Sequence, residues 1–103
     1  MTGLLEQHQD AIGQLCRRHR VRRLEAFGSS VDPARFHYET SDLDFLVEFL
    51  PLAPGEYADS YFDLLESLEQ LCGRRVDLVM TSAITNDYFL QAISRQRVVL
   101  YAA

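Results

Sequence analysis

Residues 41–49, which read Ser-Asp-Leu-Asp-Phe-Leu-Val-Glu-Phe, constrain the fold more than any other part of the chain. Successive side chains of a β-strand point to opposite faces of a sheet. The odd-numbered residues of 43–49 are all apolar and would form a buried face, while Asp42 and Asp44 would share the opposite face. Two carboxylates one pleat apart repel each other unless a cation neutralises them. The segment therefore predicts a strand that carries an acidic site for a hard divalent metal such as Mg²⁺.

Two further groups of residues could belong to the same site. Asp77 interrupts the apolar run 76–80, which has strand character and could place a third carboxylate beside the first two. Gly28, Ser29 and Ser30 follow another short apolar segment. Glycine there would let the backbone approach a ligand closely, and the serine hydroxyls and amides could donate to phosphate oxygens. The combination favours a metal-dependent phosphate site over an isolated turn and a strand-edge charge.

Composition limits the class of protein. A chain of 103 residues, 48% of them hydrophobic, can build one ordinary core, so residues 1–103 are expected to form a single domain. No apolar run is long enough to span a bilayer and the N-terminus lacks a signal pattern, which predicts a cytoplasmic protein without membrane contact. The net charge of −5 argues against direct nucleic-acid binding. Cys16 and Cys72 fall at apolar helix positions and are expected to be packed free thiols.

Helices and strands are expected to alternate along the chain. Apolar residues recur at helical spacing through the first twenty residues and again from Tyr57 to Cys72, where Gly73 suits a helix C-terminus. Strands are expected at residues 24–27, 42–49, 76–80 and 98–101, and shorter helical turns at 32–36 and 81–95. This order predicts an α/β domain with a small mixed β-sheet covered by helices.

In their order along the chain, Gly28-Ser29, Asp42-Leu43-Asp44 and Asp77 resemble the motif of the nucleotidyltransferase superfamily. The resemblance extends over nearly the whole chain. It is closest to the minimal nucleotidyltransferase (MNT) type, the antitoxin partner of HEPN-domain toxins. This resemblance implies the nucleotidyltransferase (polymerase beta-like) fold. It also implies that the three aspartates are the catalytic residues and hold two Mg²⁺ ions, which clamp the attacking and leaving oxygens.

The same resemblance implies a substrate and a partner. Gly28, Ser29 and Ser30 would cradle the triphosphate of ATP, and the protein would act as an antitoxin by transferring AMP to a Tyr hydroxyl of a cognate HEPN toxin. Toxin and antitoxin could form a hetero-oligomer. Larger transferases of the superfamily grip the acceptor with an additional helical domain, for which 103 residues leave no room. The acceptor would therefore have to bring its own surface.

An alternative function is a non-enzymatic antitoxin that blocks a partner ribonuclease by binding it and keeps the acidic residues as a vestige. Its support is the spacer between Ser30 and Asp42, which is slightly longer than in MNT proteins, lacks their second glycine and contains Asp32. An enzyme that uses a small-molecule acceptor is a third hypothesis. These possibilities differ in one measurable respect, which is whether a nucleotide is transferred and to what.

Two segments each allow two interpretations. The basic cluster at residues 17–23 is either a solvated helix end or a patch that binds an acidic partner or RNA. Residues 98–101, together with Tyr88 and Phe89, form either a partner surface or an edge strand that closes the core of the domain itself.

Overall fold

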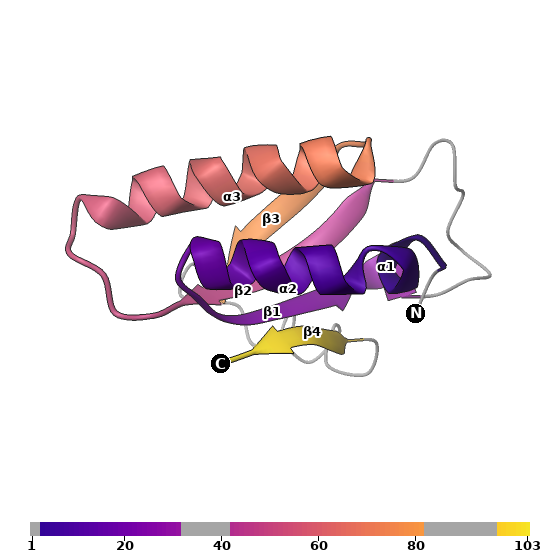
Figure 1. Ribbon diagram of the computed structural model, residues 1–103, viewed down its shortest axis with the longest axis horizontal. Helices are drawn as coiled ribbons and strands as arrows, with labels where there is room; N and C mark the ends of the chain where they lie inside the picture. The colour runs from indigo at the N-terminus through magenta and orange to yellow at the C-terminus, as the bar shows by residue number, and fades with distance from the viewer. Residues whose placement is uncertain (1–2, 32–41, 82–96) are drawn as a thin grey trace.

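A computed structural model describes residues 3–31, 42–81 and 97–103 of the chain (Figure 1). In these residues, four strands form one sheet with the order β3-β2-β1-β4. Two short helices precede the first strand, and a longer helix connects the second strand to the third. In chain order the elements are α1 (Gly3–Gln7), α2 (Gln9–Arg18), β1 (Val21–Phe27), the 3-10 turn η1 (Gly28–Val31), β2 (Leu43–Phe49), α3 (Glu56–Cys72), β3 (Val76–Met80) and β4 (Val98–Ala102).

The sheet is mixed, as the sequence predicts. β1 pairs antiparallel with both β2 and β4, whereas β2 and β3 run parallel. A parallel pair needs a crossover connection, and α3 is part of that connection. α2 and α3 lie side by side over one face of the sheet (Figure 1). The opposite face is therefore the one on which the acidic residues of β2 and β3 emerge.

The hydrophobic core lies between the helices and the covered face of the sheet. Leu43, Phe45 and Val47 are fully buried in it, and Phe49 is nearly so. The predicted alternation along β2 is therefore confirmed. On the opposite face, Leu46 is also buried, where it packs with an aromatic residue of β1 and a valine of β3. The face that carries the acids thus has an apolar floor beside them.

Cys16 of α2 and Cys72 at the end of α3 are buried and free, as predicted. Burial raises the pKa of the Cys16 thiol to about 12, against a smaller opposing effect of Arg17. Burial also raises the pKa of the Cys72 thiol, opposed by Arg74. Both side chains therefore act as small apolar residues that join the helix layer to the sheet.

The first twenty residues form two helices, so the prediction of one continuous helix is wrong. α1 ends at Gln7 and α2 begins at Gln9, with His8 between them at φ −102° and ψ 8°. Residues 6–10 are all polar and none of them is buried. Backbone hydrogen bonds from the N–H of His8 to the carbonyl of Leu4 (3.3 Å) and from the N–H of Ile12 to the carbonyl of His8 (2.8 Å) continue through this stretch, so the interruption is confined to one residue.

The strand bounds differ modestly from the prediction. β1 begins at Val21 rather than at residue 24, because Arg22 and Arg23 are exposed strand residues that break the apolar pattern. β4 pairs with β1, and Leu100 is buried in the core. The interpretation of residues 98–101 as an edge strand that closes the domain's own core is therefore confirmed.

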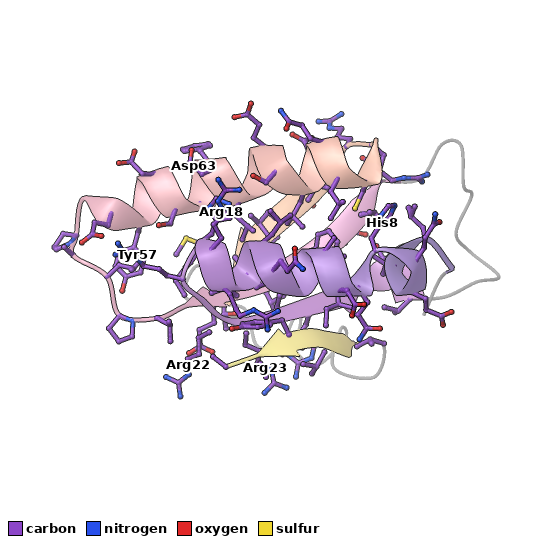
Figure 2. All side chains as sticks on the ribbon, viewed as in Figure 1. His8, Arg18, Arg22, Arg23, Tyr57 and Asp63 are labelled. Carbon is purple, nitrogen blue, oxygen red and sulfur yellow. The ribbon has the colours of Figure 1, made fainter. Side chains whose placement is uncertain are left out.

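The basic cluster at residues 17–23 is spread over two sides of the fold. Figure 2 shows Arg18 on the helix layer, whereas Arg22 and Arg23 project near β4. Three arginines of the cluster have a glutamate partner, so less uncompensated positive charge remains for an RNA or an acidic protein. The ion pairs are Arg20–Glu56 at 2.5 Å, Arg22–Glu48 at 3.9 Å and Arg23–Glu25 at 2.6 Å.

Some predictions fall on parts of the chain that the structure does not describe. The helical turns expected at residues 32–36 lie outside the described residues, as do those expected at 81–95 apart from Thr81, and so do Tyr88 and Phe89. In the described part of the chain, no helix combines the length and the apolar character that crossing a bilayer requires.

Candidate active site

The register of the sheet places Asp44 directly beside Asp77. These two residues are opposite each other in the parallel pair of β2 and β3, and neighbouring strands lie about 4.8 Å apart. Asp42 immediately precedes β2 and is exposed. The negative charges of Asp42 and Asp77 both act on Asp44. The three acids singled out in the sequence are therefore brought together by two strands at one end of the sheet.

Asp44 is the acid whose surroundings perturb it most. Burial, followed by the negative charges of Asp77 and Asp42, raises the pKa of its carboxyl group from 3.8 to about 6. Each of these effects disfavours the ionised form, and a cation placed between the carboxylates would reverse the balance. A carboxylate with this kind of perturbation, next to specific charged neighbours, is typical of a functional site.

The backbone of Gly28 lies close to the carboxylate of Asp44. Gly28 has a φ of 64°, a region that residues with a side chain rarely adopt. A Cβ atom at this position would lie 2.9 Å from Oδ2 of Asp44. Phe27 is opposite Asp44 in the sheet, so the turn begins beside the point where the acid emerges. Glycine is therefore required here by the backbone and by the space that Asp44 occupies.

The hydroxyl group of Ser30 points into the protein and contacts the backbone of Asp44. Ser30 is completely buried, and its Oγ accepts a hydrogen bond of 2.7 Å from the backbone N–H of Asp44. This bond joins η1 to the beginning of β2, so Ser30 helps to hold Asp44 in place. Ser29 lies in the same turn, and its side chain is outside what the structure describes.

We expect Gly28→Ala to lower the free energy of unfolding by about 1–2 kcal/mol, because alanine is strained at a positive φ. Gly73→Ala is the matched control. Gly73 has a similar φ of 67°, but no atom lies within 4 Å of the added Cβ. Urea unfolding should show a comparable loss for both variants. Only Gly28→Ala should also weaken binding of Mg-ATP in calorimetry, and equal binding by the two variants would contradict the contact with Asp44.

The residues of the site fit Mg²⁺, which prefers carboxylate oxygens. Within the described residues, no three Asp, Glu, His or Cys side chains are arranged so that they could hold an ion by themselves. Mg²⁺ is usually bound by one or two carboxylates, and water and substrate phosphates complete its coordination. Asp44 and Asp77 supply such a pair next to the turn that begins at Gly28.

Sequence reasoning missed Glu25, which lies on the same face as the acids. Its side chain is 8% exposed and forms ion pairs with Arg23 at 2.6 Å and Arg97 at 3.1 Å. A buried carboxylate is tolerated only with such partners. No sequence signal could have found it, because Glu25 resembles an ordinary strand residue and Arg97 is far away in the chain. The pairing compensates the charge of Glu25, unlike the charges around Asp44.

An apolar hollow of about 570 Å³ adjoins β3, the strand that carries Asp77. Two tyrosine rings of α3 and the last residues of β3 form most of its wall. Its surface suits an aliphatic or aromatic side chain rather than a charged one. The lining residues are Pro54, Tyr57, Ala58, Tyr61, Leu78, Val79 and Met80.

No family model matches the chain, but individual proteins are similar to it. Two similar proteins come from Methanocaldococcus jannaschii. "Putative protein adenylyltransferase MJ0128" is 32% identical over 90 residues, which cover 87% of this chain and 84% of the relative. "Putative protein adenylyltransferase MJ1379" is 30% identical over 90 residues, with the same shares covered.

Solved structures share the fold. One described as "Structure of putative minimal nucleotidyltransferase" has a TM-score of 0.72 and 31% identity, and covers 91% of this chain and 90% of its own. A toxin–antitoxin crystal structure with AMP-PNP has a TM-score of 0.68 and 20% identity over 92% of this chain and 73% of its own. A structure of a tri-AMPylated Shewanella oneidensis HEPN toxin in complex with MNT antitoxin has a TM-score of 0.64 and 19% identity, and the match covers 95% of this chain and 72% of that chain. The last two likenesses show the fold alone.

Proposed function

This chain belongs to the minimal nucleotidyltransferase family, and from that premise we propose that it is an antitoxin that transfers AMP from ATP to a Tyr hydroxyl of a HEPN-type toxin. The observation that carries the proposal is the placement of Asp44 beside Asp77 and against the Gly28 turn. Paired carboxylates next to a side-chain-free turn are suited to a metal-bound triphosphate.

Each residue of the site has a part in the proposed reaction. The backbone of Gly28 and the amide of Ser29 bind the triphosphate, and Ser30 holds Asp44 in position. Asp42, Asp44 and Asp77 would hold two Mg²⁺ ions, which would supply positive charge against the phosphate oxygens. Asp77 accepts the proton of the tyrosine hydroxyl. The tyrosine oxygen then bonds to the α-phosphorus of ATP, and the bond between that phosphorus and the pyrophosphate leaving group breaks. The products are an adenylylated tyrosine and pyrophosphate.

Three observations support a protein acceptor with a tyrosine. The apolar hollow beside β3 could contact an aromatic side chain or its apolar neighbours next to Asp77. The net charge of −5 favours encounter with a basic protein partner. Among proteins of the same fold is an MNT antitoxin in complex with an AMPylated HEPN toxin. We therefore propose ATP and a toxin protein as the two substrates.

Intact-protein mass spectrometry tests the proposal. The chain is incubated with ATP, Mg²⁺ and its co-expressed toxin partner, and the toxin is expected to gain mass in steps of one adenylate and to lose activity. Asp42→Ala/Asp44→Ala should leave the toxin mass unchanged, because the metal and triphosphate are no longer held. Asp59→Ala/Asp63→Ala, which removes two acids of α3 outside the site, should transfer as well as the parent.

The experiment also separates the enzyme from the non-enzymatic antitoxin. A toxin that gains no mass yet is silenced equally by the parent and by the Asp42→Ala/Asp44→Ala variant would contradict the transfer reaction and support steric blocking. A mass gain on a small molecule rather than on the toxin would instead point to a different acceptor class.

A further inference from the structure

Asp77 lies on an edge strand, and this makes its position less secure than that of Asp44. In the described residues, β3 pairs with β2 alone, whereas β2 lies between two strands. β3 is also only five residues long. Edge strands open more easily than central ones unless other contacts hold their free side. The alignment of the two acids therefore depends on what holds the outer side of β3.

The backbone N–H and C=O groups of the two residues that flank Asp77 point outward from the edge of the sheet. The backbone N–H of Leu43 donates to the carbonyl of Arg75 at 3.1 Å, so the N–H and C=O groups of Arg75 face β2. Orientation alternates along a strand, so those of Asp77 also face β2 and those of Val76 and Leu78 face outward. The outward groups cannot be satisfied by β2 and would need partners from another element.

Two side chains of α3 supply these partners. The carboxylate of Glu69 accepts a hydrogen bond of 3.2 Å from the N–H of Val76. The hydroxyl of Tyr61 donates to the carbonyl of Leu78 at 2.5 Å. The two bonds flank Asp77 on both sides in the sequence. α3 thus takes the place of a neighbouring strand along this part of the edge.

We propose that Tyr61 and Glu69 are positioning residues that fix Asp77 relative to Asp44. The proposal rests on the proposed transferase function, in which both acids must serve one reaction. Burial and, to a smaller extent, the negative charge of Asp77 raise the pKa of the Tyr61 hydroxyl, so Tyr61 lies close to the site. Misplacement of a catalytic group by about 1 Å can cost on the order of 10²-fold in rate. Loss of one of the two bonds should therefore lower turnover measurably.

Tyr61→Phe and Tyr57→Phe form a matched pair of variants. Both tyrosines lie on α3 and line the same hollow, and each would lose one hydroxyl. The hydroxyl of Tyr57 accepts a hydrogen bond from the N–H of Leu52, which lies between β2 and α3 rather than in β3. We expect Tyr61→Phe to lower kcat about tenfold with KM for ATP changed less than about twofold. Tyr57→Phe removes a hydroxyl from the same wall of the hollow, so kcat should be clearly lower in Tyr61→Phe than in Tyr57→Phe, although both variants should lose similar stability.

Glu69 provides an independent test with a rescue. Glu69→Leu removes the acceptor for the Val76 N–H, whereas Glu69→Gln keeps an oxygen that can accept the bond. Hydrogen exchange of the Val76 amide, followed by NMR, should accelerate in Glu69→Leu and return towards the parent rate in Glu69→Gln, and kcat should follow the same order. Glu66→Leu, one turn away on the exposed side of α3, is the control and should leave both readouts unchanged.

The outcomes distinguish this inference from the proposed function. If the parent transfers AMP, Asp77→Asn does not, and Tyr61→Phe and Glu69→Leu turn over as fast as their controls, the positioning role is overturned while the transferase function stands. If the parent transfers no AMP, both are overturned. Faster exchange at Val76 with an undiminished kcat would also overturn the inference, because it would show that a loosened edge does not matter for the reaction.

Discussion

Asp44→Asn is expected to abolish AMP transfer and, in the same protein, to raise the free energy of unfolding measured without metal. Asparagine has nearly the same shape but cannot ionise, so it removes the cost of burying a charge at this position and the repulsion of that charge by Asp77 and Asp42. In the folded protein Asp44 keeps its proton up to about pH 6, whereas its ordinary pKa is 3.8. Stability that the parent has below pH 4 is therefore lost as the pH rises through 6. The variant escapes this loss.

The size of the effect follows from the shift in pKa. About two units correspond to at most about 3 kcal/mol, and solvent screening at this partly exposed site reduces the expected gain to about 1–2 kcal/mol. In urea unfolding with EDTA present, the free energy of unfolding of Asp44→Asn should therefore exceed that of the parent at pH 8 and be close to it near pH 4. Asp63→Asn, which removes an exposed acid on α3, should show no such dependence. A variant less stable than the parent at pH 8 would contradict the assigned environment of Asp44.

Ligands should reverse the order of the two proteins. Mg²⁺ and ATP together should raise the melting temperature of the parent more than either does alone, because a ligand bound only to the folded state stabilises it. Asp44→Asn should lose this synergy and about 10³-fold or more of the transfer rate. Calorimetry that finds equal binding of Mg-ATP by both proteins would show that Asp44 is not the shared ligand.

Removal of residues 98–103 is expected to unfold the domain rather than merely detach a partner. These residues form β4, which pairs with β1. Leu100 is 7% exposed and packs in the main core, whereas Val99 on the same strand is 43% exposed. Leu100→Ala should cost about 2–4 kcal/mol, because it leaves a cavity in the core. Val99→Ala should cost less than about 1 kcal/mol.

Urea unfolding and circular dichroism check this expectation. The truncated chain should lose its cooperative transition, and the two alanine variants should separate by at least about 1 kcal/mol. A truncated chain that unfolds cooperatively with the parent's midpoint but no longer binds its toxin would show that β4 serves as an interface instead.

Local patterns in the sequence were sufficient for much of the fold. The two-residue alternation of β2 and the helical spacing of α3 each reflect one burial face, and Gly73 marks the end of α3 with a positive φ. β3 was placed correctly because its residues are apolar on both sides of a single acid. The break at His8 could not be predicted, since it is confined to one residue and the helical spacing of apolar residues continues on both sides of it.

The candidate site was predictable only in part, for a physical reason. The alternation of a strand puts Asp42 and Asp44 on one face, whereas Asp77 joins them through the register between β2 and β3. The buried Oγ of Ser30 and the outer bonds of β3 depend instead on contacts between distant segments. Tyr61 falls on the apolar period of α3, which predicts only that its side chain lies on the face of the helix that packs on the sheet. Its ring does line the helix–sheet boundary, but its hydroxyl adds a contact that periodicity does not encode.

The reaction rates of the two buried cysteines with a thiol reagent would report how often the helices open. Alkylating reagents attack the thiolate, and burial keeps both thiols protonated and inaccessible in the folded state. Their modification therefore requires the helices to separate from the sheet. Cys72 is the last residue of α3, which holds the outer side of β3, whereas Cys16 is a buried residue of α2. The relative labelling rates of the two thiols would thus time the opening of each helix without an introduced probe.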